Sequence, residues 1–226
     1  QKYILLRKSF ENFKNNFLND YSENSLNTLF NNFKSTEWEW LENYVLFVSL
    51  KDYFGGRPWN EWEESAKFRH EEALLKYKEI LGNELEYHRF IQFLFFIQWK
   101  NLKKYANDNN IKIIGDIPIF VAYDSSDVWA NPHIFQFDHE LKPVKVAGVP
   151  PDYFSSTGQL WGNPLYDWNK LKETNYKCWI DRVKTNLSLY DILRIDHFRG
   201  FEAYWAVPYG NETAQYGQWE KGPEIE

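Results

Sequence analysis

The sequence predicts an α/β fold, an incomplete (β/α)8 barrel of the TIM type with a helical N-terminal portion. Three observations support this prediction. Residues 1–108 carry apolar residues at helical spacing together with many Glu, Lys and Leu, which favour helices. Residues 111–121 follow as an apolar, β-branched run, and residues 191–197 form a second such run after a stretch with helical character. Strands that alternate with helices are typical of parallel sheets.

The N-terminal portion, residues 1–108, is expected to be mainly helical and to hold a subdomain together with some barrel helices. Its clearest helix covers residues 84–106, where apolar residues recur at mostly helical intervals. This spacing predicts one apolar face that packs on a core. The residues of that face are Phe90, Phe93, Phe96, Ile97 and Leu102.

The second portion, residues 109–226, begins with the strand at 111–121, whose nearly continuous apolar character predicts burial on both faces. Residues 122–169 are rich in Pro, Gly, Ser, Asp and Trp with little periodicity, which predicts a long loop of functional use. Helical signals return over residues 176–190, and the second buried strand follows at 191–197. The predicted order is strand, long loop, helix and strand.

Composition and charge narrow the classes of function. The 226 residues are 43% hydrophobic and 26% charged, as in an ordinary globular protein. The formal charge is −6, and the 32 acidic and 26 basic residues are well mixed, so we expect no nucleic-acid partner. No stretch approaches the roughly 20 apolar residues of a membrane span, and the start of the chain lacks the apolar run of a signal peptide. We therefore expect no membrane association and a cytoplasmic location.

Cysteine and aromatic content add two expectations. The single cysteine, Cys178, excludes an internal disulfide, and no Cys or His cluster has ligand spacing, so we expect neither metal nor cofactor. Aromatic residues make up 19% of the chain. Most are expected in the core, and the remainder can stack on the flat faces of pyranose rings.

The start at Gln1, the lack of methionine and the final Gly-Pro-Glu-Ile-Glu lead us to expect a piece of a longer protein.

Charged residues lie near the ends of both predicted strands. Asp116 and Asp196 are both placed late in a strand, and active sites of parallel barrels lie at the carboxyl ends of the strands. Arg194 and Asp196 lie on the same face of an extended strand, so the arginine can lower the pKa of this carboxylate and keep it ionised as a nucleophile. A structural ion pair at a strand end is the alternative. Residues 197–200 add further polar groups and a chain reversal.

Three segments resemble motifs of the amylomaltase (4-α-glucanotransferase) family and follow one another along the chain as they do in that family. The family is related in mechanism to the α-amylase clan. Residues 194–201, Arg-Ile-Asp-His-Phe-Arg-Gly-Phe, resemble its nucleophile strand, and residues 115–121, Gly-Asp-Ile-Pro-Ile-Phe-Val, resemble an earlier strand. Residues 148–164, which include Pro-Pro-Asp-Tyr-Phe and Gly-Gln-Leu-Trp-Gly-Asn-Pro, resemble its active-site lid loop. The resemblance is close over residues 111–221 and loose over the N-terminal helices. It implies transfer of α-1,4-glucan segments between maltooligosaccharides.

The resemblance also implies roles for particular residues. Asp196 would be the nucleophile of a retaining double displacement through a covalent glucosyl intermediate, with Arg194 as its charge partner. Asp116 would hold the network and the bound sugar. Six further residues are implied to bind the sugar through hydrogen bonds or ring stacking: His197, Asp152, Phe154, Gln159, Trp161 and Asn163.

Structural alternatives exist for several of these roles. Backbone donors at a strand end can satisfy Asp116 without any part in catalysis. Phe154 and Trp161 can pack within the loop as ordinary hydrophobic residues. His197 can donate to a sugar hydroxyl or can be a histidine satisfied at a strand end.

The family's acid/base glutamate follows on the strand after the nucleophile, with a His-Asp pair later and a donor-site segment near the N-terminus. No matching motif occurs in these 226 residues. Glu202 and Glu220 follow Asp196 but lie outside such a motif. We therefore expect the isolated chain to be catalytically incomplete. We also expect half a barrel with open sheet edges to be marginally stable or to self-associate.

Three rival functions remain open at the level of sequence. A non-catalytic carbohydrate-binding module would present exposed rings on a sheet face and no buried Arg-Asp pair. A structural or interaction protein would use its aromatic residues only in the core. A hydrolase of the α-amylase clan would use water as the acceptor.

Overall fold

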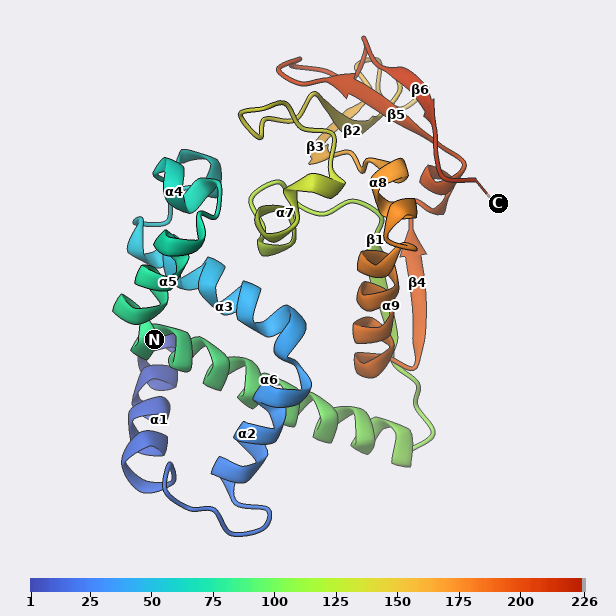
Figure 1. Ribbon diagram of the computed structural model, residues 1–226. Coiled ribbons are helices and arrows are strands. Elements are labelled where there is room, and N and C mark those ends of the chain that lie inside the picture. The colour runs from blue at the N-terminus through green and yellow to red at the C-terminus, as the bar shows by residue number, and fades with distance from the viewer. Residues whose placement is uncertain (225–226) are drawn as a thin grey trace. The chain divides into compact units, whose positions relative to one another are not determined.

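The structure, a computed structural model, describes residues 1–224 (Figure 1). The chain divides into two compact units, Gln1–Leu102 and Lys103–Glu226. The long helix α6 (Gly82–Asp108) crosses the boundary between them. Each unit has its own core of buried hydrophobic residues.

The first unit is built from helices. Ser25 shows how local chemistry starts one of them, because its hydroxyl accepts a hydrogen bond from the backbone N–H of Thr28 at the first turn of α2. Besides the larger part of α6, the elements of this unit are α1 (Lys2–Asn16), α2 (Leu26–Thr36), α3 (Trp38–Tyr53), η1 (Trp59–Glu61), α4 (Glu64–Lys67) and α5 (Glu71–Ile80).

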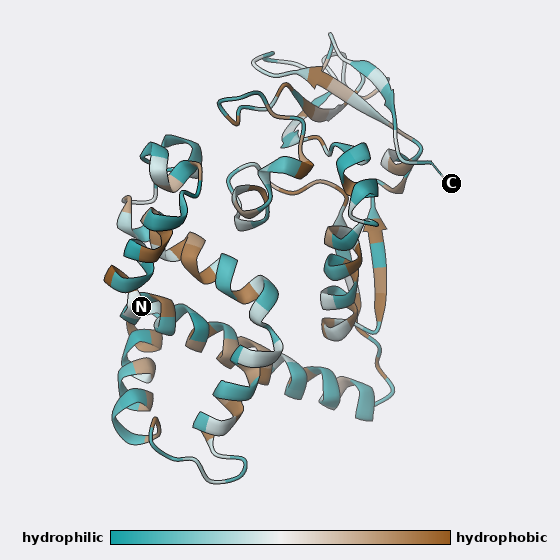
Figure 2. Ribbon diagram, viewed as in Figure 1, coloured by the Kyte–Doolittle hydropathy of each residue, from teal (hydrophilic) through white to brown (hydrophobic). Residues whose placement is uncertain are grey.

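Aromatic rings fill the core of the first unit. Phe90, Phe93 and Phe96 of α6 are buried, and each packs on rings from α1 or α2; the Phe13 and Phe90 ring centroids, for example, are 4.9 Å apart. In Figure 2 the helices alternate between hydrophobic and hydrophilic colours, as helices with one apolar face do. The predicted apolar face wrongly includes Leu102, which is 54% exposed and does not belong to the buried core.

The second unit combines two small sheets with short helices. The predicted α/β class is therefore confirmed. Its elements in chain order are β1 (Ile114–Pro118), α7 (Ser126–Ala130), η2 (Pro132–Ile134), β2 (Lys145–Val149), β3 (Gln159–Pro164), α8 (Trp168–Glu173), α9 (Lys177–Leu189), β4 (Ile192–Asp196), η3 (Phe198–Phe201), β5 (Ala203–Pro208) and β6 (Gln218–Lys221).

The two strands predicted from their apolar runs, β1 and β4, form a parallel two-stranded sheet in which Pro118 is the register partner of Asp196. Helix α9 packs along both strands (Figure 1). The predicted burial on both faces is wrong: Ile117 is buried, whereas Ile114 is 64% exposed and Ile192 is 44% exposed. The cause is that, among the described residues of the second unit, α9 packs on one face of this sheet and the other face is exposed.

The second sheet was not predicted. Its strands run in the order β3-β2-β5-β6, and all neighbours are antiparallel. The long loop expected at residues 122–169 therefore contains a β-hairpin of β2 and β3 as well as α7 and η2. The predicted lid loop at residues 148–164 is the second half of this hairpin, with residues 150–158 as its turn. These strands are short, and their glycines and prolines hide the alternation that identifies a strand.

Among the helices of residues 1–224, none is both long enough and apolar enough to cross a membrane.

Candidate active site at the carboxyl ends of β1 and β4

A bidentate ion pair joins the two strands. Arg194 of β4 is the register partner of Asp116 of β1, and its Nε donates to Asp116 Oδ1 at 3.1 Å while Nη2 donates to Oδ2. Both side chains are exposed on the uncovered face of the sheet. The Arg194 guanidinium holds the pKa of Asp116 below its ordinary value, and the carboxylate raises the pKa of Arg194 in turn. Asp116 is therefore ionised and fixed in orientation.

Asp196 lies two residues beyond Arg194 on the same face of β4, at the last position of the strand. The hydrogen bonds of the guanidinium go to Asp116 and not to Asp196, although Arg194 and Asp196 lie on the same face of the strand as predicted. A two-residue spacing places the arginine beside the carboxylate, but the cross-strand partner is closer to its donors. The negative charge of Asp196 still contributes to the raised pKa of Arg194, after the larger contribution of Asp116. Within residues 1–224 the exposed Asp196 carboxylate accepts no hydrogen bond, which leaves its oxygens accessible.

His197 follows directly in a left-handed backbone conformation, with φ of 54°, and starts η3. Its ring meets the ring of Trp161 edge-on, with centroids 4.8 Å apart and planes at 84°. Burial lowers the pKa of His197, although the negative charge of Asp196 acts in the opposite direction. Its Nε2 is buried and has no hydrogen-bond partner in the described part of the chain. The imidazole beside the candidate nucleophile is therefore kept neutral.

The contact with His197 brings strand β3 of the hairpin to the end of β4. Trp161 is 37% exposed, and its Nε1 donates to Oε1 of Gln159 at 3.1 Å. This bond occupies the single donor of the indole and fixes the orientation of its ring. Two predicted sugar-binding residues therefore bond each other, and one of them, Trp161, contacts His197 directly after the strand of the candidate nucleophile.

The turn of the hairpin carries exposed aromatic rings. Asp152 organises the turn, because its Oδ1 accepts the backbone N–H groups of Phe154 at 2.9 Å and Ser155 at 2.8 Å. Tyr153 is 97% exposed and Phe154 is 93% exposed, and the two rings meet edge-on. One oxygen of Asp152 thus has a structural role, and the Phe154 ring lies in solvent and does not pack within the loop.

Asn163, the last of the predicted sugar-binding residues, holds two segments together. Its Nδ2 donates to the backbone carbonyl of Val121 at 2.9 Å, which ties β3 to the segment that follows β1. One of the two N–H groups of this amide is therefore used by the backbone.

A polar network crosses the second sheet, and the sequence did not predict it. Glu220 of β6 forms an ion pair with Lys145 of β2 and accepts hydrogen bonds from Tyr204 at 3.3 Å and Gln218 at 3.1 Å. Burial opposes ionisation of Glu220, but the bonds from Lys145 and Gln218 outweigh it and lower the pKa. Lys145 and Glu220 are far apart in sequence, so no local pattern signals their pairing.

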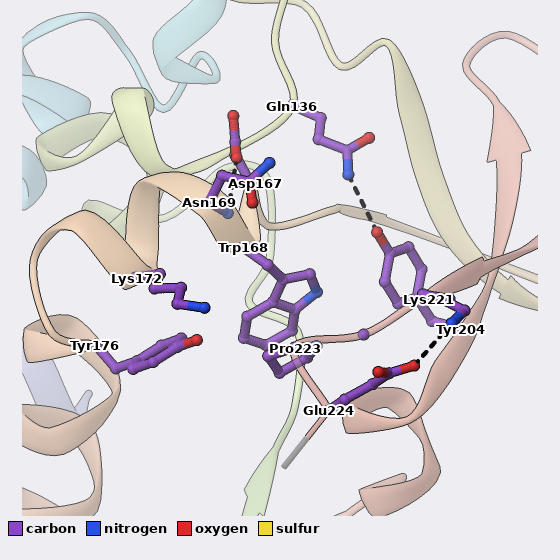
Figure 3. Close-up of a pocket in the computed structure, with 11 residues that line it drawn as sticks. Gln136, Asp167, Trp168, Asn169, Lys172, Tyr176, Tyr204, Lys221, Pro223 and Glu224 are labelled. Atoms are coloured by element: carbon purple, nitrogen blue, oxygen red, sulfur yellow. Dashed lines mark hydrogen bonds and ion pairs between the residues drawn. The ribbon is translucent and has the colours of Figure 1, made fainter. Parts of the chain in front are cut away.

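A cavity of about 450 Å³ opens between α8 and the segment that follows β6 (Figure 3). An ion pair between Lys221 and Glu224, 3.2 Å long, lies at its wall. None of the predicted catalytic or sugar-binding residues lines this cavity. The lining residues are Gln136, Asp167, Trp168, Asn169, Lys172, Tyr176, Tyr204, Lys221, Gly222, Pro223 and Glu224.

Residues 1–224 include no group of three or more His, Cys, Asp or Glu side chains that could hold a metal ion. Cys178 is half-buried and free.

Comparisons with known proteins place this geometry in context. The sequence profile of a family described as 4-alpha-glucanotransferase matches residues 1–226. The chain is 55% identical over 226 residues to a 4-alpha-glucanotransferase of Clostridium butyricum. The aligned region is 100% of this chain and 45% of that protein. A solved amylomaltase from Streptococcus agalactiae, in complex with acarbose, matches with a TM-score of 0.87 and 40% identity, over 96% of this chain and 43% of that one.

A second solved structure, an amylomaltase from Corynebacterium glutamicum, is 18% identical, with a TM-score of 0.73 over 98% of this chain and 27% of that one. At this level of identity the likeness shows the fold alone. The chain thus has the mixed α/β fold of these structures and spans less than half the length of the relatives named here.

Proposed function

Because the chain belongs to the 4-alpha-glucanotransferase family, we propose that its protein transfers α-1,4-glucan segments between maltooligosaccharides. The reaction is a retaining double displacement through a covalent glucosyl-Asp196 intermediate. The observation that carries this proposal is the exposed carboxylate of Asp196 at the carboxyl end of β4, beside the ion pair of Asp116 and Arg194.

In the first step an oxygen of Asp196 attacks the anomeric carbon, and an acid protonates the leaving oxygen. In the second step the 4-hydroxyl of another glucan attacks the anomeric carbon of the intermediate, gives its proton to the conjugate base of that acid, and releases Asp196. Asp116 is unsuited to the role of the acid, because Arg194 keeps it ionised. Its role is to orient Arg194, which lies on the same face of β4 as the proposed nucleophile.

The hairpin supplies the proposed contacts with the sugar. Trp161, Phe154 and Tyr153 offer exposed ring surfaces that fit the apolar faces of pyranose rings. His197 and Gln159 offer polar groups close to the nucleophile strand. Asp152 retains one oxygen outside the turn, while Asn163 acts indirectly by holding β3. A hairpin that covers the bound sugar excludes water and favours transfer to a glucan hydroxyl.

We further propose that β1 and β4 are neighbouring strands of a (β/α)8 barrel, within a division of the chain into residues 1–108 and 109–226. The parallel register and the cover of α9 on one face support this assignment. The other face carries exposed Ile114 and Ile192, which is typical of a face that further strands or a second copy would cover. A stable, monodisperse monomer of the chain would count against self-association.

The proposed function is tested with Asp196→Asn in a full-length 4-alpha-glucanotransferase that contains these 226 residues. Maltotriose is the substrate, and glucose and longer oligomers are the products. We expect the variant to lose transfer while it still binds maltooligosaccharide. Asp181→Asn changes a half-buried carboxylate on α9 that pairs with Lys177; it is the matched control and should leave the activity unchanged.

The outcomes also separate the rival functions. Transfer at the normal rate by Asp196→Asn contradicts the role of this residue. A carbohydrate-binding module predicts binding without transfer by the unaltered protein. Glucose and maltose without longer oligomers would indicate hydrolysis.

A further inference from the structure

Arg182 of α9 donates hydrogen bonds to the backbone at the end of β1. Its Nη2 donates to the carbonyl oxygen of Pro118 at 2.8 Å, and its Nη1 donates to the carbonyl oxygen of Ile119 at 3.3 Å. One planar guanidinium thus bonds two successive carbonyl groups where the strand ends. A lysine has a single nitrogen and cannot reproduce this planar arrangement.

These carbonyl groups lie next to the candidate nucleophile. Pro118 is the register partner of Asp196, and Asp116 lies two residues earlier on the same strand. Pro118 has no backbone N–H to donate, so β1 lacks one of its own hydrogen-bond donors at this position. The hydrogen bonds from Arg182 of α9 therefore hold the end of β1 in place where the sheet has one hydrogen bond fewer.

Arg182 is itself held by aromatic residues. Its Nη1 also donates to Oη of Tyr166 at 3.0 Å, and its guanidinium carbon lies 4.6 Å from the ring centroid of Trp179. Tyr166 is 1% exposed and stacks on Phe120, two residues beyond Pro118, with ring centroids 6.0 Å apart. The guanidinium therefore connects α9, the end of β1 and the segment after the hairpin.

We propose that Arg182 is a positioning residue for the transfer reaction. It holds the carboxyl end of β1 so that Asp116 and Arg194 keep their place beside Asp196. This inference rests on the proposed function, because it assigns the positioned groups to the reaction. Displacement of catalytic groups by about 1 Å can lower the rate about 100-fold, so the loss of two backbone anchors should be visible in kcat.

The first measurement uses the 226-residue chain and does not depend on its activity. Hydrogen exchange with mass spectrometry is compared for the unaltered chain, Arg182→Gln and Arg182→Lys. We expect faster exchange in Arg182→Gln at residues 119–121 and at β4, with unchanged exchange in α1 to α3. Lys184→Gln, a change of an exposed cation on the same helix, is the control and should leave exchange unaltered.

The second measurement uses a full-length 4-alpha-glucanotransferase that contains these residues. We expect Arg182→Gln to lower kcat for maltotriose about 10- to 100-fold and to change KM by less than about twofold. Arg182→Lys should restore part of the loss. The fraction of active enzyme is counted by covalent labelling, so that kcat refers to folded sites only.

The two measurements distinguish a positioning role of Arg182 from a purely structural one. A normal kcat per labelled site, with fewer labelled sites, would show that Arg182 only stabilises the fold and would overturn the proposal. Unchanged exchange at the end of β1 would overturn the anchoring step. Absence of transfer by the unaltered full-length protein would overturn the proposed function, and the exchange measurement would still report on the anchor.

Discussion

Arg194 donates to both carboxylate oxygens of Asp116, its register partner on the neighbouring strand, and not to Asp196 on its own strand. Arg194 was expected as the charge partner of Asp196, but its hydrogen bonds are made with Asp116. It builds a rigid ion pair across β1 and β4 and leaves the Asp196 carboxylate without a hydrogen bond from residues 1–224. The proposed nucleophile, Asp196, then lies near the positive charge of Arg194 and keeps both of its oxygens free of hydrogen bonds from Arg194.

The ion pair predicts the titration of Asp116. Its pKa lies below the ordinary value of 3.8 because of the hydrogen bonds from Arg194. The stabilisation it gives is therefore complete above that ordinary value and is lost as the pH falls through the lowered pKa. We expect Arg194→Gln to raise the pKa of Asp116 towards 3.8, as measured by NMR titration of the carboxyl carbon.

The matched control for this titration is Arg199→Gln, because the Arg199 guanidinium lies 4.6 Å from the ring centroid of Trp219 and not beside Asp116. This change should leave the pKa of Asp116 where it is. An unchanged pKa in Arg194→Gln would contradict the ion pair.

A second prediction concerns His197 and the ring of Trp161 against it. Burial lowers the pKa of His197, so the folded chain binds fewer protons there than the unfolded chain does. Stability should therefore fall as the pH drops from the ordinary value of 6.5 through the lowered pKa of the folded state. Trp161→Ala exposes the imidazole and should raise its pKa, as measured by NMR of the ring protons. Trp38→Ala, which removes an exposed ring in the first unit, should not.

The two parallel strands could be predicted because apolar runs are local signals, although β1 is shorter than the predicted strand at 111–121. Asp196 is the last residue of β4, as predicted, whereas Asp116 is the middle residue of β1 and not a late one. Local sequence reasoning could not identify the partner of Arg194, because the choice depends on the register between strands that are 78 residues apart. The same limit applies to Glu220 and Lys145, which pair across a sheet whose short strands carry little periodicity.

Asp152 and Asn163 illustrate a further limit of sequence reasoning. Both are polar residues in a segment that resembles a sugar-binding loop, and both use their side chains for backbone groups of the chain itself. A sequence shows which groups can form hydrogen bonds. It does not show whether a nearby backbone group has already taken them.

Gly115 provides a test of the packing beneath the site. A Cβ added there would lie 2.1 Å from Cδ2 of Tyr190, so the ring would have to move. We expect Gly115→Ala to lower the free energy of unfolding of the chain by about 1–3 kcal/mol, measured by urea denaturation. Gly82→Ala is the matched control, because nothing lies within 4 Å of its added Cβ. It should be neutral or stabilise the chain by about 0.4–1 kcal/mol. Equal stability of the two variants would show that Tyr190 does not pack on Gly115.

The network around Glu220 predicts that removal of its negative charge lowers the stability of the second sheet. Glu220→Gln removes the charge that Lys145 neutralises and leaves that ammonium half-buried without its partner. We expect a loss of about 1–3 kcal/mol in the free energy of unfolding by urea denaturation. Glu173→Gln disrupts an exposed ion pair with Lys170 on α8 and should change stability by less than about 1 kcal/mol. A loss no larger than that of the control would mean that the network is held together by neutral hydrogen bonds.

The last prediction concerns the isolated 226-residue chain and maltotriose. Retaining transfer requires, besides the nucleophile, a protonated carboxyl group about 5–5.5 Å away. On the neighbouring strand the available carboxylate is Asp116, and Arg194 keeps it ionised and bonds both its oxygens. We therefore expect the folded chain to release neither glucose nor longer oligomers, as measured by chromatography of the products. A full-length relative such as the Clostridium butyricum 4-alpha-glucanotransferase serves as the positive control. Sustained turnover by the isolated chain, lost in Asp196→Asn, would show that the acid lies within these residues.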